Sequence, residues 1–273
     1  MAVRGNGPPV PPDTEPGPAR VKALFISCLT LITLGDLDGI EARTAECLAQ
    51  AEHFGVAEAA AATASAILAA TLRGGPAQVV SLSEVLLATH RAEEPLTFPT
   101  MVALVSTGHA YVAAGRIAKA IGRLEEHGAT CDRHGERCQR AWGDLLRAQA
   151  ELARGRPRAA QEYARAALAV KYRLHDSVGY GMCLDVLAQA AATDGQVEHA
   201  AHLLGLAQQV WDTLGRPQTG IPAWTAAREA CEQHTRQALG GHAYRLAFHT
   251  GYETDLDTGI ARTLGTPGSD SSG

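Results

Sequence analysis

Apolar positions recur along this chain at helical spacing, in runs that end at glycine or proline. Between Gly108 and Gly128, one such run ends at Gly115–Arg116 and a second follows, with Ala120 and Leu124 on its inner face. Glycines recur every forty residues, and each interval has a second break near its middle. The glycines are Gly35, Gly75, Gly115, Gly155 and Gly195, and the intervening breaks are Gly55, Pro95, Gly135, His175–Asp176 and Gly215. This repeat predicts helix-turn-helix units in series.

A single helix-turn-helix unit cannot bury its own apolar face and must stack on its neighbours. We therefore predict an all-α fold, a tetratricopeptide-like α-solenoid of five helical hairpins with a C-terminal helical cap. The expected helices of the first, fourth and fifth hairpins span about 20–34, 37–54, 137–154, 158–174, 177–193 and 196–214. The expected divisions are a disordered Pro-rich leader at 1–18, the repeat array at 19–215, the cap at 216–265 and a disordered tail at 266–273.

Local signals mark several helix starts. Pro76 and Pro222 suit the first turn of a helix, where the missing N–H of proline is harmless. Thr97 or Thr100 can cap the helix that ends near Ala114, and Asp255 can cap a last short helix.

Composition narrows the function classes. Apolar residues make up 46% of the chain and aromatic residues only 5%, so the core must consist mainly of alanine, leucine and valine. The net charge of −5 argues against binding of nucleic acid through phosphate contacts. No run of eighteen apolar residues predicts a membrane span, and the first twenty residues lack the apolar segment of a signal peptide. Six cysteines without CxxC spacing favour reduced thiols and a cytoplasmic location.

The C-terminal third carries a family resemblance. Its matching residues are Leu184, Leu187–Ala188, Gly195, His199–Ala201, Leu203–Gly205, Trp211, Leu214–Gly215, Ile221–Ala223, Leu239–Gly240, Phe248, Gly251, Leu256, Ile260 and Leu264. In this order they resemble the helical-repeat region of LuxR-type and AfsR/SARP-like ATP-binding transcriptional regulators, which are common in actinobacteria. The resemblance covers about residues 172–264 and implies a sensory or protein-interaction module.

The other activities of that family are not carried over. No GxxxxGK[ST] phosphate loop occurs in the chain, and no basic recognition helix follows Leu264. We therefore expect no cofactor, no ATP binding and no direct contact with nucleic acid.

In tetratricopeptide-like arrays, the first helices of the hairpins line a concave groove. Counting from the central glycines places five polar or aromatic residues there, and these are His109, Trp142, Gln149, Asp185 and Gln189. An aromatic anchor among polar groups is typical of a site for a peptide or a small effector. The alternative is that Trp142 only packs between repeats.

Two further patterns have alternative interpretations. His127, Cys131, His134 and Cys138 share one helical stripe and have zinc-ligand chemistry, but the break at Gly135 favours structural roles and no metal. Residues 133–173 hold ten Lys/Arg and four Asp/Glu, which suits either an acidic partner or a solvated helix face.

No catalytic residues are predicted, since both the GxSxG elbow and the HExxH motif are missing. The sequence favours a non-enzymatic regulatory module that binds a protein or small effector in the groove. A constitutive scaffold and an enzyme of a secondary-metabolite pathway are the alternatives.

Overall fold

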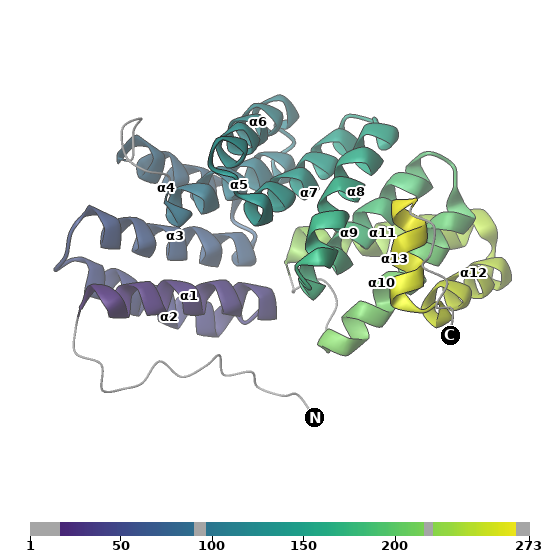
Figure 1. The fold of residues 1–273 in the computed structure, drawn as a ribbon, viewed down its shortest axis with the longest axis horizontal. Helices are drawn as coiled ribbons and strands as arrows, with labels where there is room; N and C mark the ends of the chain where they lie inside the picture. The colour runs from purple at the N-terminus through teal and green to yellow at the C-terminus, as the bar shows by residue number, and fades with distance from the viewer. Residues whose placement is uncertain (1–16, 90–96, 216–220, 266–273) are drawn as a thin grey trace. The chain divides into compact units, whose positions relative to one another are not determined.

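A computed structural model describes residues 17–89, 97–215 and 221–265 (Figure 1). These ranges are helical and contain no strand, which confirms the all-α prediction. Their helices are α1 (Pro18–Leu34), α2 (Leu37–Ala51), α3 (Val56–Arg73), α4 (Pro76–Thr89), α5 (Phe98–Ala113), α6 (Ile117–His134), α7 (Arg137–Ala153), α8 (Pro157–Arg173), α9 (Ser177–Thr193), α10 (Val197–Leu214), α11 (Pro222–Leu239), α12 (Gly241–Glu253) and α13 (Leu256–Leu264). Nearly all of the predicted leader, the break at Pro95 and the predicted tail lie outside the described residues.

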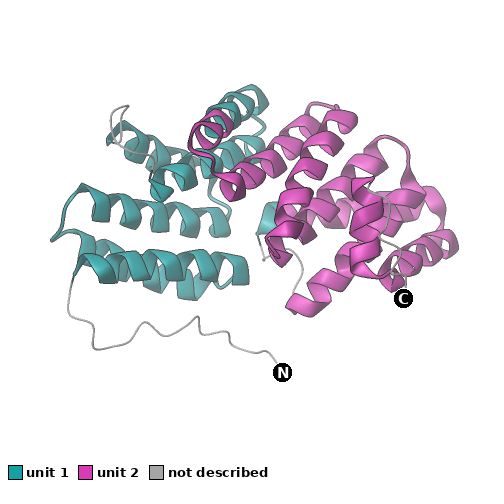
Figure 2. Ribbon diagram, in the orientation of Figure 1, with its two compact units in different colours: residues 1–127, 219–223 teal, residues 128–218, 224–273 magenta. Residues whose placement is uncertain are grey.

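The chain divides into two compact units (Figure 2). Unit 1 holds residues 1–127 and 219–223, and unit 2 holds residues 128–218 and 224–273. The divisions fall inside α6 and near the start of α11. The predicted partition into a repeat array and a cap stays a prediction.

The predicted breaks coincide with helix ends. Gly115 separates α5 from α6 and has a left-handed backbone, with φ of 69°, that favours glycine. In the second hairpin the left-handed residue is Gly74, with φ of 76°, one position before the predicted Gly75. At the half-period break after α8, His175 takes the left-handed conformation with φ of 54°.

The predicted helix starts are also confirmed. Pro76 and Pro222 are the first residues of α4 and α11. The Thr97 hydroxyl accepts from the Thr100 N–H at 3.4 Å, and an Asp255 carboxylate oxygen accepts from the Thr258 N–H at 2.9 Å. Each bond satisfies one of the N–H groups that a helix start leaves without a partner.

In unit 1, α3 is the central helix. It packs on α1, α2, α4 and α5, and its alanines Ala60, Ala61 and Ala64 are buried. Small side chains let neighbouring helices approach closely. Within the described ranges α3 is the one helix long and apolar enough to cross a membrane, yet 61% of it is buried inside the structure. Its packing is that of a core helix.

In unit 2, consecutive helices pack in series. α8 contacts α7 and α9, α10 contacts α9, and α7 also contacts α9. α12 packs along α10, and α13 touches α8 and α10. Alanine and leucine side chains are buried in this unit, including Leu145, Ala164, Leu168, Leu187 and Leu204.

The α10–α12 contact depends on two glycines. A Cβ atom on Gly205 would lie 1.9 Å from the Phe248 carbonyl oxygen, and one on Gly251 would lie 1.9 Å from the His202 carbonyl oxygen. Backbone therefore touches backbone, and no larger residue fits at either position.

Candidate functional site

Trp142, the predicted aromatic anchor, lies half-buried on α7. The Lys171 ammonium nitrogen is 3.7 Å from the centre of its ring, in cation–π geometry. Lys171 has no exposed side-chain surface and donates to Asp176 Oδ2 at 2.9 Å. The other oxygen of Asp176 accepts from the Gly179 N–H at the start of α9. One face of the Trp142 ring therefore packs against the Lys171 ammonium group, which is buried and paired with Asp176.

Gln149 and Gln189 lie on the neighbouring helices α7 and α9, and both are half-buried. Gln149 is seven residues after Trp142, two helical turns along the same face of α7. The amide nitrogen of Gln189 is buried and has no hydrogen-bond partner among the described residues. Such a donor costs stability unless an acceptor meets it, so it is suited to a carbonyl or carboxylate of a ligand.

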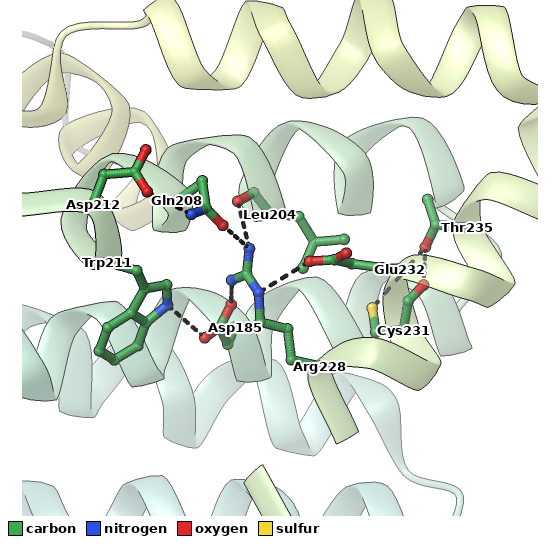
Figure 3. A network of polar contacts seen from close by, with 9 residues as sticks. All are labelled: Asp185, Leu204, Gln208, Trp211, Asp212, Arg228, Cys231, Glu232 and Thr235. Carbon is green, nitrogen blue, oxygen red and sulfur yellow. Dashed lines mark hydrogen bonds and ion pairs between the residues drawn. The ribbon is translucent and has the colours of Figure 1, made fainter. Parts of the chain in front are cut away.

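Asp185 lies in the interior of unit 2 and has no exposed surface (Figure 3). One of its carboxylate oxygens accepts from the Trp211 indole N–H at 2.9 Å, and the other pairs with Arg228 Nη1. An open groove was the sequence-based expectation for this residue. The structure instead buries its side chain completely against Trp211 and Arg228.

Arg228 is the centre of the polar network in Figure 3. Its guanidinium group also donates to Gln208 Oε1 at 2.8 Å and to Glu232 Oε1 at 3.0 Å. It is only 4% exposed. A buried guanidinium is stable only when hydrogen bonds and opposite charges compensate it. Its partners Asp185 and Gln208 lie on α9 and α10, so the network connects α11 to both helices.

His109 belongs to unit 1, whereas the other four predicted groove residues belong to unit 2. Its half-buried ring lines a cavity of about 180 Å³ with Gly74 and Pro76 from the α3–α4 turn and with residues 221–223. Burial lowers the pKa of His109 to about 4.

Acid should therefore destabilise unit 1 through His109. Since the folded-state pKa lies below the ordinary value of about 6.5, the unfolded chain binds the proton more readily. The contribution of His109 is complete above about pH 6.5 and is lost as the pH falls towards 4. Between pH 7 and pH 5, the wild type should lose at most about 2 kcal/mol of unfolding free energy more than His109→Gln. Urea titrations at both pH values measure this difference, and identical losses in the two proteins would contradict it.

All six cysteines are free thiols, and five of them are buried, whereas Cys138 is half-buried. Burial raises the pKa of Cys131 and of Cys47 to about 11, so both thiols stay protonated near neutral pH. His127 and Cys131 have no exposed surface. In the described part of the chain, no group of three or more His, Cys, Asp or Glu side chains is arranged to hold a metal ion.

Much of the positive charge of residues 133–173 is compensated inside unit 2. Arg140 pairs with Asp144 at 3.0 Å, and Arg147 pairs with Glu151 at 2.9 Å. Lys171 is paired with Asp176, as described above. The acids Asp144 and Glu151 are already counted in the net charge of this stretch, whereas Asp176 lies outside it and offsets one further positive charge. Docking of an acidic partner there stays a prediction.

Sequence reasoning missed Lys171 and Arg228, the two cations that organise this part of unit 2. In the sequence, Lys171 is one of several basic residues in a predicted helix. The residues next to it in the chain do not predict that its side chain is completely buried. Arg228 is 43 residues from its partner Asp185. Counting from a central glycine places residues within one repeat, but it cannot predict a contact between residues 43 positions apart.

A scan against protein-family models, a search of curated proteins and a search of solved structures each found no match to this chain.

Proposed function

We propose that this chain is a non-enzymatic regulatory module that binds a protein or small effector. The binding surface would be the face of α7 and α9 that carries Trp142, Gln149 and Gln189, which we call the α7–α9 face. The observation that carries the proposal is the half-buried Trp142, whose ring is fixed by Lys171, together with the half-buried Gln149 on α7 and Gln189 on α9. A rigid aromatic group with nearby amides loses little entropy on binding and supplies both contact area and orientation.

We also propose how the helices are arranged. Five helical hairpins in a tetratricopeptide-like α-solenoid, followed by a C-terminal helical cap, account for the forty-residue spacing of the helix breaks. Serial packing in α1–α2–α3 and in α7–α8–α9 supports that arrangement within each unit. A repeat protein of this kind presents the first helices of its hairpins as an extended binding surface.

The partner that we propose follows from the family resemblance of the C-terminal third. Given the resemblance over residues 172–264, the chain would act in the cytoplasm of an actinobacterium as the sensory arm, or a relative of the sensory arm, of a LuxR- or AfsR-type regulator. Ligand binding would favour one arrangement of the helices and pass that preference to an ATP-binding partner. Such a shift requires the ligand to bind the two arrangements with different affinity.

Trp142→Ala is the variant that tests this surface. We expect it to weaken binding to the purified ATP-binding module of a LuxR- or AfsR-type regulator by at least about tenfold, because it removes the anchor. Calorimetric titration measures the affinity, and circular dichroism shows whether the variant still unfolds cooperatively.

The matched control is Leu174→Ala, which removes an apolar side chain that is 52% exposed at the end of α8. It should leave the affinity unchanged. If Trp142→Ala lowers stability but the folded protein binds like the wild type, Trp142 is a packing residue and the proposal is wrong. Binding without any change of shape in X-ray scattering would favour the constitutive scaffold.

A further inference from the structure

A groove of about 600 Å³ lies on unit 2, on a different surface from the α7–α9 face. Gln208 of α10 and two residues of α11 form one side of it, and the exposed face of α12 forms the other. Its volume falls in the range of ligand and peptide sites, about 300–1,000 Å³.

The lining of this groove is basic. Residues 233–252 include Arg236, Arg245 and three histidines and no Asp or Glu, and Glu253 follows them with its Oε1 3.7 Å from His249 Nδ1. Both arginines line the groove, together with His242 and His249. Among the described lining residues the one acid is Glu232, whose Oε1 already accepts from Arg228 Nε at 3.0 Å. The groove therefore presents positive charge on a chain whose net charge is −5.

The lining also offers an apolar surface. Leu246 is 62% exposed, and the half-buried Phe248 also lines the groove. The Phe248 ring packs against Tyr244, with 5.7 Å between ring centres, and the Arg236 guanidinium carbon is 4.7 Å from the Tyr244 ring centre. Arg236 is thus positioned before any ligand arrives, which lowers the entropy cost of binding.

The N-terminus of α12 opens beside the same groove. Its N-cap is Gly240, which has no side chain to accept from the first N–H groups, and His242 in the first turn lines the groove. The helix dipole adds partial positive charge at this end and favours a carboxylate there.

We propose that this groove binds an acidic segment of a partner protein. Asp or Glu carboxylates of the segment pair with Arg236 and Arg245, and one large apolar side chain packs on Leu246 and Phe248. This inference does not rest on the α7–α9 face and concerns a second surface.

Nucleic acid fits the groove less well. Base stacking needs an open aromatic face. Tyr244 is 4% exposed and has Arg236 over its ring, and the most exposed apolar side chain is the aliphatic Leu246. A peptide side chain is the better match for that surface.

The test uses a phage-displayed library of random short peptides, selected on the full chain. Enriched peptides should combine Asp or Glu with a neighbouring leucine or aromatic residue. A fluorescein-labelled copy of the most enriched peptide is then titrated by anisotropy. Arg245→Glu should weaken its binding at least about tenfold, because it reverses a charge at the contact.

The matched control is Arg158→Glu, which makes the same charge change at a side chain that is 87% exposed on α8. It should alter the affinity by no more than about twofold. Leu246→Ala provides a second variant, which leaves the charge intact and should weaken binding several-fold by removing apolar contact. Thermal melts of all three proteins establish that they are folded.

Several outcomes would overturn the proposal. Enriched peptides without acidic residues would do so, as would equal effects of Arg245→Glu and Arg158→Glu. If an oligothymidylate displaces the peptide and its own binding is lost in Arg245→Glu, the groove is a nucleic-acid site. If light scattering finds a dimer that Arg245→Glu dissociates, the occupant is a second copy of this chain.

Discussion

Gly251→Ala is expected to separate α12 from α10 and to destabilise unit 2 by about 3 kcal/mol, the upper end of the usual cost of overpacking. The new methyl group would lie 1.9 Å from the His202 carbonyl oxygen. A flexible side chain could move away, but this neighbour is helix backbone, so the whole of α12 must shift. Gly205→Ala places a methyl group at the same distance from the Phe248 carbonyl oxygen and should act alike.

Urea unfolding followed by circular dichroism measures this effect. The double variant should cost less than the sum of the two single variants, because both break one contact. Gly122→Ala is the control, since Gly122 lies inside α6 and a Cβ atom there meets nothing within 4 Å. It should stabilise the protein by about 0.5–1 kcal/mol through helix propensity. If Gly251→Ala also proves neutral or stabilising, the close approach of α10 and α12 does not exist.

Asp185→Ala is expected to cost about 3–5 kcal/mol of unfolding free energy. The substitution leaves the Arg228 guanidinium buried without its main counter-charge and removes the acceptor of the Trp211 indole N–H. Replacing both partners, as in Asp185→Leu with Arg228→Met, should recover most of the loss, because no buried charge then remains.

The pair of the exposed Arg158 and the half-buried Asp194 is the matched control for this network. Its closest atoms are 3.8 Å apart, and the Arg158 side chain is 87% exposed. Arg158→Ala should change the unfolding free energy by less than about 0.5 kcal/mol. An equally small effect of Asp185→Ala would mean that the buried network does not hold α11 in place.

The helices of this chain could be predicted closely because their ends depend on local chemistry. A glycine such as Gly115 ends a helix through its own backbone conformation, and Thr97 or Asp255 caps one through an N–H three residues away. Such signals need no knowledge of tertiary contacts. In the second hairpin two adjacent glycines follow α3, and Gly74 is the one that adopts the left-handed conformation.

The side chains of the proposed α7–α9 face could be predicted only in part. Helical spacing correctly grouped Trp142 with Gln149 on one helix, but it could not show that Asp185 points into the core, because its partner comes from α11. The burial of Lys171 beneath Trp142 likewise depends on how α7 and α8 pack. The close contact of α10 with α12 depends on Gly205 and Gly251, and only the three-dimensional structure shows that these two glycines meet backbone of the other helix.

Hydrogen–deuterium exchange of the full chain, with and without the purified ATP-binding module of a LuxR- or AfsR-type regulator, tests the central claim most directly. If the module binds the α7–α9 face, hydrogen exchange should slow on binding in peptides that cover α7 and α9, around Trp142 and Gln189. Protection confined to other helices, or no change in exchange at saturating concentrations of the module, would contradict it.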